Sequence, residues 1–300
     1  MWPRSRFTAP SKKERTSKAA PGNSSAAPTV SLPAQFTVQL HLPETNETFS
    51  LPDCHNDLTI QKLKDHLELL AGIPLDFQRL QYLDEIDLPD DSTFKSHDIV
   101  PGGTITLRIW QHDGLGHLVA AAAEGNIPKL ISAGVTKDPV GRTPQSDFLG
   151  PEQEADWRAH RTFVALYIAS HRGHAAAVHF LLENGADVHF KTPLGRTALH
   201  VAAIKGHYDC IDELLTYGAQ AATPDNEGQT AMSLARLWGQ KQSERLRIPL
   251  LQQLHENGRP HILHLAMARI DVKDGATGIL LSFKDESVVS DACQQGKKIH

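Results

Sequence analysis

Histidine and cysteine are the residue types in this 300-residue chain that could bind a metal ion or supply a nucleophile, and the chain has 17 and 3 of them. The pairs His171-x-x-His174 and His207-x-x-Cys210 have a spacing compatible with metal ligands on one helix. However, His174 and His207 each follow a glycine at a tight turn, where an imidazole commonly bonds the backbone. His200 ends a Thr-x-x-His motif, in which the two side chains fix a helix start. We therefore expect structural histidines and no metal site.

Catalytic motifs are not found either. The sequence has no G-x-S-x-G elbow, no P-loop and no G-x-G-x-x-G after a predicted strand. Cys210 takes the place of a buried valine in a predicted helix, so we do not expect a reactive thiol there. Cys54 and His55 are adjacent in the chain, and adjacent residues do not form a catalytic dyad. We expect a protein that is not an enzyme and has no cofactor.

Composition limits the partners and the compartment. The formal net charge of −5, from 30 basic and 35 acidic residues, gives no general argument for nucleic-acid binding. The three cysteines are far apart and have no C-x-x-C spacing, which excludes a disulfide scaffold and a zinc ribbon and indicates a reducing compartment. The longest apolar run has six residues, far fewer than a membrane span needs. We expect an intracellular protein, cytoplasmic or nuclear, with no membrane partner.

Residues 1–33 differ in composition from the rest of the chain. They are rich in Ser, Pro and Ala, contain six basic residues and one acid, and have no periodic apolar pattern. Such a segment cannot bury enough surface to offset the entropy of ordering it, so residues 1–33 are predicted to be a disordered, basic tail. A transit peptide or a basic arm for an acidic partner is the functional alternative.

Residues 34–110 are acidic, with five basic and thirteen acidic residues, and have the pattern of a mixed α and β domain. Asp57 is the expected N-cap of a helix with apolar residues at helical spacing, and Gly72 is its expected stop. Alternating segments around this helix predict a hairpin before it and two short strands after it. This β-β-α-β-β order predicts a β-grasp; the expected elements are 36–40, 48–51, 58–71, 80–83 and 104–109.

A specific resemblance begins at the end of that helix. The stretch from Gly72 to Tyr82 reads G-I-P-L-D-F-Q-R-L-Q-Y and resembles ubiquitin, whose pattern is G-I-P-x-D-x-Q-R-L-x-F/Y. The similarity continues through the last predicted strand and implies a ubiquitin-like domain at 34–110, a type of domain that usually docks on ubiquitin ligases or the proteasome. However, Gln81 and Arg108 replace two apolar residues of the ubiquitin recognition face, and the terminal Gly-Gly is missing. The resemblance therefore favours a docking module with its own partner.

The chain repeats at a fixed interval after position 115. Gly173-His174 aligns with Gly206-His207, and Gly185-Ala186 aligns with Gly218-Ala219. This period, about 33 residues, resembles the ankyrin repeat, in which one unit cannot bury its apolar faces alone and several must stack. The expected units are a degenerate repeat at 115–144, an insertion at 145–162, repeats at 163–195 and 196–228, and a capping repeat at 229–258. Residues 259–300 remain a C-terminal segment of unassigned structure.

The resemblance to ankyrin repeats also implies where a protein partner binds. Such stacks present the ends of their first helices and their hairpin tips on one concave side. We call the corresponding residues the concave positions; they are His171, Arg172, Ile204, Lys205, Leu237 and Trp238 at helix ends and Phe190, Lys191 and Leu194 at a hairpin tip. Trp238 is either a binding hot spot or is covered by the C-terminal segment, and the sequence favours neither.

Taken together, the sequence predicts an α+β chain in which a β-grasp ubiquitin-like domain precedes an all-α ankyrin-repeat solenoid. The expected function is that of a monomeric, non-enzymatic scaffold or adaptor that binds a protein through the concave positions and binds no nucleic acid. The alternative is a ubiquitin-system adaptor, whose ubiquitin-like domain docks on a ligase or the proteasome while the repeats select a client.

Overall fold

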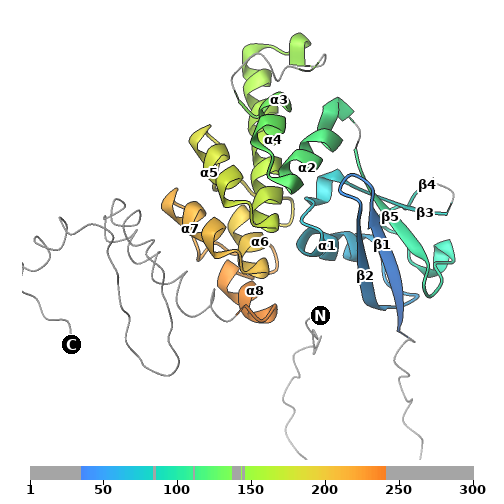
Figure 1. The fold of residues 1–300 in the computed structure, drawn as a ribbon. Helices are drawn as coiled ribbons and strands as arrows, with labels where there is room; N and C mark the ends of the chain where they lie inside the picture. The colour runs from blue at the N-terminus through green and yellow to red at the C-terminus, as the bar shows by residue number, and fades with distance from the viewer. Residues whose placement is uncertain (1–34, 84–85, 111, 137–142, 144–145, 241–300) are drawn as a thin grey trace, which may run out of the picture.

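The structure is a computed structural model that describes residues 35–83, 86–110, 112–136, 143 and 146–240 (Figure 1). The predicted basic tail 1–33, the C-terminal segment 259–300 and the second helix of the capping repeat lie outside these residues. In the described part, a five-stranded sheet with one helix precedes a stack of paired helices. The predicted fold class, a β-grasp-like domain followed by helical repeats, is confirmed.

The N-terminal domain is a mixed sheet covered by helix α1 (Ile60–Leu70). The strands lie in the order β2-β1-β5-β3-β4, with β1 and β5 parallel and the other pairs antiparallel. This arrangement adds a short strand, β4, and a few residues at the strand ends to the predicted pattern. The strands are β1 Phe36–Leu42, β2 Glu47–Cys54, β3 Gln78–Tyr82, β4 Ile86–Asp87 and β5 Thr104–Ile109.

Helix α1 begins two residues later than predicted. Its N-cap is Thr59, whose Oγ1 accepts a hydrogen bond from the backbone N–H of Lys62 at 3.3 Å, so the prediction of Asp57 was wrong. The reason is that Thr59 has an extended backbone and forms a bridge with Thr93, which keeps it out of the helix. The helix buries an apolar stripe against the sheet; its members are Ile60, Leu63 and Leu67, each at most 1% exposed.

The second part of the chain is a stack of helix pairs. The first helices of successive pairs pack side by side in the order α2, α4, α6, α8, and α5 and α7 form a second layer beside them (Figure 1). The helices are α2 Leu115–Glu124, α3 Ile127–Ser132, α4 Pro151–Arg172, α5 Ala175–Glu183, α6 Ala198–Lys205, α7 Tyr208–Thr216 and α8 Ala231–Leu237.

Helix α4 is much longer than a first repeat helix. Residues 151–162, which the sequence assigned to an insertion, form about three additional turns at its N-terminus. Pro151 occupies the first helical position, where its missing N–H costs nothing, and Glu152 and Glu154 lie in the first turn, where acids favour a helix start. This part of the insertion is therefore a rigid extension of the stack.

Histidines connect successive repeats through the backbone. The Nε2–H of His174 donates to the carbonyl of Ala123 at 2.7 Å, and the Nε2–H of His207 donates to the carbonyl of His171 at 3.1 Å. His200 accepts at Nδ1 from the backbone N–H of Thr197 at 3.0 Å. The expected structural roles of these three histidines are confirmed.

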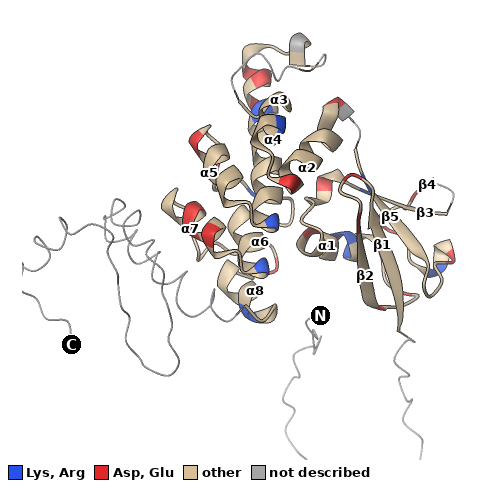
Figure 2. Cartoon of the chain, viewed as in Figure 1, with Lys and Arg blue, Asp and Glu red and all other residues tan. Residues whose placement is uncertain are grey.

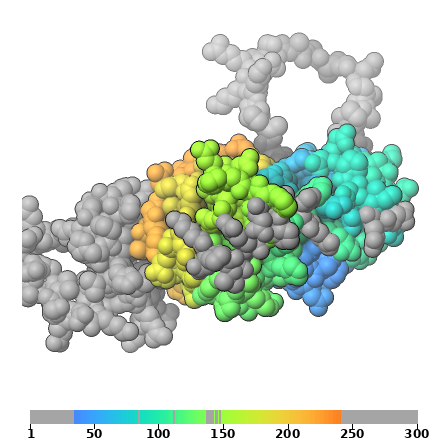
Figure 3. Space-filling view, turned by 90° about the horizontal axis from the view of Figure 1, so that it is seen from above, coloured from blue at the N-terminus to red at the C-terminus, as the bar shows by residue number. Residues whose placement is uncertain are grey.

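The two parts of the chain share one apolar core. Helix α1 lies between the sheet and the helices α6 and α8 (Figure 1), and the space-filling view shows the surface of the N-terminal domain adjoining that of the repeats (Figure 3). The basic ends of α4 and α6 are turned toward α1 (Figure 2). The N-terminal domain thus occupies the side of the stack where the concave positions lie.

Candidate protein interface on the concave face of the repeats

The structure places four of the nine concave positions directly against the N-terminal domain. His171, Arg172 and Lys205 form hydrogen bonds with it, and the ring of Trp238 stacks on the imidazole of His66 with centroids 6.0 Å apart. His66 therefore covers part of Trp238, a cover that the sequence did not suggest.

The other five concave positions are not brought together by this contact. Ile204 is buried in the repeat core at 1% exposure. Phe190 stacks on Phe163 with ring centroids 4.2 Å apart and stays 36% exposed. Leu237 is 55% exposed, Lys191 is exposed and Leu194 is half-buried. Apart from the buried Ile204, the concave positions are thus divided between a part that contacts the N-terminal domain and a rim that faces solvent.

The carbonyl groups at the C-terminal end of α1 are the main acceptors in this interface. His171 donates from Nε2 to the carbonyl of Leu69 at 2.9 Å, and Lys205 donates from Nζ to that of Leu70 at 3.1 Å. Arg172 donates from Nη2 to the carbonyl of Ala71 at 3.2 Å. The last carbonyls of a helix have no partner within it and form the negative end of its dipole. Two cations and one imidazole on the repeats therefore complete the end of α1.

Gly72 allows this close approach. Its backbone has a φ of +73°, and a Cβ atom there would lie 2.3 Å from Cγ of His171. Any side chain at position 72 would therefore be strained in its backbone and would collide with the imidazole. The glycine that ends α1 is required both by its own turn and by the repeats.

A buried carboxylate lies at the centre of the interface. Glu68 has no exposed surface, and its Oε1 accepts from the hydroxyl of Tyr167 at 3.0 Å and that of Thr192 at 2.8 Å. Its Oε2 accepts from the backbone N–H of Leu75 at 3.0 Å, and the guanidinium of Arg196 lies 3.9 Å from Oε1. Burial raises the pKa of Glu68, while Arg196 and these donors favour the ionised form. Three of the four groups around this carboxylate come from the repeats.

Arg196 joins α1 to the next hairpin of the stack. Its Nη1 donates to the carbonyl of Asp65 at 2.7 Å, and its Nε lies 3.6 Å from a carboxylate oxygen of Asp225. The side chain is only 5% exposed. This arginine is therefore held by two parts of the chain that are far apart in the sequence, which orients it toward α1.

Charge around His171 keeps its imidazole neutral. Burial, followed by the positive charges of Lys205 and Arg172, lowers the pKa of His171 well below its usual value. Burial also lowers the pKa of Lys205. Arg172 forms a two-pronged ion pair with Glu47 on β2, with distances of 2.5 and 2.6 Å. This carboxylate balances the positive charge that the repeats bring to the end of α1.

Three residues of this interface were missed in the sequence analysis. Tyr167, Thr192 and Arg196 complete what we call the docking face, which consists of Tyr167, His171, Arg172, Thr192, Arg196, Lys205 and Trp238. One signal was present: Tyr167 stands one repeat period before His200, where the repeat motif has histidine. The departure from the motif marks the place where the repeat bonds α1.

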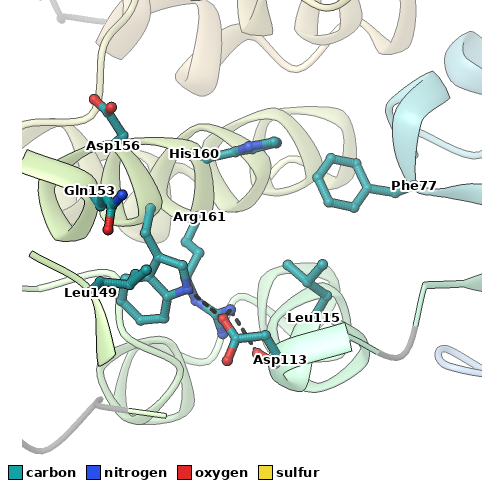
Figure 4. Close-up of a pocket in the computed structure, with 9 residues that line it drawn as sticks. Phe77, Asp113, Leu115, Leu149, Gln153, Asp156, His160 and Arg161 are labelled. Carbon is teal, nitrogen blue, oxygen red and sulfur yellow. Dashed lines mark hydrogen bonds and ion pairs between the residues drawn. The ribbon is translucent and has the colours of Figure 1, made fainter. Parts of the chain in front are cut away.

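A pocket of about 390 Å³ lies beside this interface, between Phe77 of the N-terminal domain and the first turns of α4 (Figure 4). Its base holds the segment that connects the two parts of the chain. Arg161 donates to the backbone carbonyl of Asp113 at 2.8 Å and to its carboxylate at 3.3 Å, and the indole of Trp157 donates to the same carboxylate. These contacts fix the connection at Asp113.

The described residues were searched for groups of side chains that could bind a metal ion. They contain no group of three or more His, Cys, Asp or Glu side chains that could hold a metal ion. Burial raises the pKa of Cys54 to about 11 and that of Cys210 to about 12, so both thiols stay protonated at neutral pH. None of the described helices has the length and apolar character of a membrane span.

Comparison with known proteins identifies the repeats. A search of curated proteins found no match to the chain. A family model described as ankyrin repeats in three copies matches residues 166–246. The match begins within α4, covers the predicted repeat 163–195 from residue 166, all of 196–228 and the capping repeat as far as 246, while the degenerate repeat at 115–144 lies before it. Residues 166–246, which carry all seven residues of the docking face and all nine concave positions, match the model of ankyrin repeats.

Proposed function

We propose that this chain is a non-enzymatic scaffold or adaptor that binds a protein through the concave face of its ankyrin repeats. Ankyrin repeats are in general protein-interaction modules. The observation that carries the proposal is that the docking face already holds a protein segment, α1, by donors to its backbone carbonyls and to one carboxylate. The same face has the chemistry to hold a segment of another protein.

The solvent-exposed rim of the concave positions supports contact with a separate protein while α1 stays in place. Phe190, Lys191 and Leu237 are exposed, and the first two are neighbours at one hairpin tip. An exposed aromatic ring beside a cation suits a binding hot spot. In this proposal, the nine concave positions form the partner site. The rim is the part of that site that a partner can reach while α1 occupies the docking face.

A second candidate is a ubiquitin-system adaptor, with residues 34–110 as a ubiquitin-like docking module. It is favoured by the position of α1, which lies between the sheet and the repeats, so that the described helices of the stack are on one side of the sheet (Figure 1). It is opposed by the polar character of that face. Arg108 donates to Gln81 at 3.1 Å, and Gln81 donates to Asp87 at 3.0 Å. A partner that buries an apolar patch would have to desolvate this network.

Affinity purification with mass spectrometry can decide between the two candidates. The intact chain would be compared with the rim variant Lys191→Glu/Leu237→Glu, the sheet variant Arg108→Ala and the exposed control Glu227→Lys. We expect the rim variant to lose its partners, while the sheet variant and the control keep them. Loss in the sheet variant alone, with ligase or proteasome subunits missing, would support the second candidate. Unchanged partners in all three variants would refute binding through the rim.

We further propose that the chain is an intracellular monomer. The two described cysteines are free and buried, which suits a reducing compartment. The side of the stack that would pair with a second copy is occupied by the chain's own α1. Light scattering on the purified chain should give the mass of a single copy, and a dimer mass would contradict this proposal.

A further inference from the structure

We infer that the docking face is a receptor for the C-terminal turn of an α-helix that carries a glutamate four residues before a glycine. In the structure this place is taken by α1, where Glu68 and Gly72 have that spacing. We further infer that α1 is exchangeable, so that a helix of this kind in a partner protein displaces it. The inference rests on the proposed scaffold function and specifies the kind of partner that the concave face accepts.

The chemistry of the contacts supports recognition of a helix end rather than of one particular domain. The donors on the docking face bond four backbone carbonyls of α1, those of Asp65, Leu69, Leu70 and Ala71. The α1 side chain that accepts hydrogen bonds from this face, among the described residues, is that of Glu68. Every helix offers the carbonyls, so the sequence requirement is limited to the carboxylate and the residues around it.

Glycine is the second requirement. The Cβ of any other residue at position 72 would enter the space of the His171 imidazole. Because the imidazole is itself held by its bond to Leu69, it cannot move away without losing that bond. A partner helix therefore needs its first left-handed residue, a glycine, directly after the turn that the face binds.

The directed contacts between α1 and the docking face are hydrogen bonds, which water can replace when α1 separates. On separation, the hydroxyls, cations and carboxylate of the interface would form hydrogen bonds with water. The net free-energy cost of breaking these polar contacts is therefore small. The apolar stripe of α1, which includes Leu63 and Leu67, is buried and would stay packed on its own sheet. Polar contacts between domains of one chain are typical of interfaces that open. Because α1 and the repeats belong to one chain, the local concentration of α1 at the docking face is high. A free helix therefore binds weakly until the contact of α1 with that face is weakened.

Glu47 offers a way to loosen α1 without changing the docking face. It lies on β2, outside the helix, and its ion pair with Arg172 is partly exposed. The variant Glu47→Lys would place a cation against Arg172 and Lys205. Adding Gly72→Ala would introduce the collision with His171. Both changes lie in the N-terminal domain, so all seven residues of the docking face stay as they are.

The probe is a fluorescently labelled peptide of residues 57–74 of this chain, and the readout is fluorescence anisotropy with the full-length protein. We expect the double variant Glu47→Lys/Gly72→Ala to bind the peptide at least about tenfold more tightly than the wild type, with Glu47→Lys alone in between. The control Glu227→Lys, a charge reversal at an exposed residue outside the docking face, should bind like the wild type. A peptide with Glu68→Gln or Gly72→Ala should lose at least about tenfold in affinity for the double variant.

Small-angle X-ray scattering on the same variants completes the test, because release of α1 together with its sheet increases the radius of gyration. If the radius of gyration increases and the peptide binds as stated, the inference holds. If the radius of gyration is unchanged in both variants, α1 is not exchangeable and the inference fails. If α1 is released and the peptide does not bind, the docking face is not a helix-end receptor. In that last case, partners that are still captured through the rim would leave the scaffold function standing, so the two failures can be told apart.

Discussion

The two faces of α1 make contacts of opposite character. Toward the sheet, the helix presents Ile60, Leu63 and Leu67, which are hydrocarbon throughout and fully buried. Toward the repeats, it presents the carboxylate of Glu68 and a row of backbone carbonyls, each bonded to a donor on another helix or hairpin. One helix therefore belongs to two interfaces, of which one excludes water by apolar packing and the other is held by directed hydrogen bonds.

The apolar contacts of α1 with the sheet serve folding, whereas its hydrogen bonds with the repeats serve recognition. Burial of a leucine side chain contributes about 1.5–3 kcal/mol and depends little on direction, so the sheet face of α1 stabilises the N-terminal domain as a unit. A hydrogen bond contributes about 0.5–1.5 kcal/mol net but requires its partner at one distance and angle. The repeat face of α1 is therefore the more selective of the two, and the less costly to open.

The largest expected effect is on the sheet face. Leu67→Ala should lower the free energy of unfolding by about 2–5 kcal/mol, because it removes buried hydrocarbon and leaves a cavity. Chemical denaturation measures this change. Leu83→Ala is a matched control, since Leu83 is 80% exposed and its loss should stay within about 0.5 kcal/mol. Equal losses in the two variants would contradict the assignment of Leu67 to the core.

The buried carboxylate on the repeat face should show the next largest effect. Tyr167→Phe removes a donor to Glu68 while keeping the ring, and should cost about 1.5–3 kcal/mol of unfolding free energy, as for a hydrogen bond to a charged group. A double-mutant cycle with Glu68→Gln measures how the two residues depend on each other. Additive losses would mean that the hydroxyl and the carboxylate contribute independently, against the bond described above.

Acid should weaken the repeat face before it affects the sheet face. Burial, and then the charge of Arg196, lowers the pKa of His66 from 6.5 to about 4. The unfolded chain then binds more protons than the folded chain between these values, so stability falls as the pH falls from 6.5 toward 4. His171 acts in the same direction, whereas Glu68, whose pKa is raised, opposes it.

Replacing the imidazole isolates its part in this pH dependence. Denaturation at pH 7 and pH 5 should show a loss on the order of 1–2 kcal/mol from His66 alone in the wild type. His66→Phe keeps a ring against Trp238 and should lose less between the two pH values. An identical pH dependence in both proteins would exclude His66 as a contributor.

The smallest effects are expected at ion pairs. Arg172→Ala removes a partly buried pair with Glu47, whose side chains are 14% and 35% exposed, and should cost about 1 kcal/mol. Lys129→Ala removes a pair with Glu124 at 57% and 52% exposure and should change stability by no more than about 0.5 kcal/mol. Thermal unfolding of the two variants side by side tests the order. If Lys129→Ala were the more destabilising change, the docking contact would be weaker than proposed here.

Sequence patterns predicted the elements better than their assembly. The repeat period located the first helices, and the pattern of alternating residues located most strands, because both depend on neighbours within one element or one repeat. The acids after Pro151 and the proline itself were signals of the long α4 that the period concealed, since the extension lies outside the repeat. Element type thus follows from local chemistry.

The docking of α1 could not be predicted in the same way. Tyr167 and Glu68 are 99 residues apart, and Lys205 and Leu70 are 135 apart, while the repeat period relates only neighbours in the stack. Four of the contacts also end on backbone carbonyls. Every residue type has this group, so the sequence does not show which carbonyls will accept. The period predicts the concave positions as places on the stack, but the contact of four of them with α1 had to be seen in the structure.

The distance along the chain between α1 and its docking face has a consequence for biosynthesis. A ribosome adds about 5–20 residues per second, so Lys205, which is 95 residues beyond Trp110 at the end of the N-terminal domain, follows it out of the translation machinery after about 5–19 s. For that interval the N-terminal domain is complete while its docking face has not been made. During this time the docking side of α1 presents the carboxylate of Glu68 and hydrated backbone carbonyls to water. These polar groups reduce the hydrocarbon surface that the nascent domain exposes before the repeats are made.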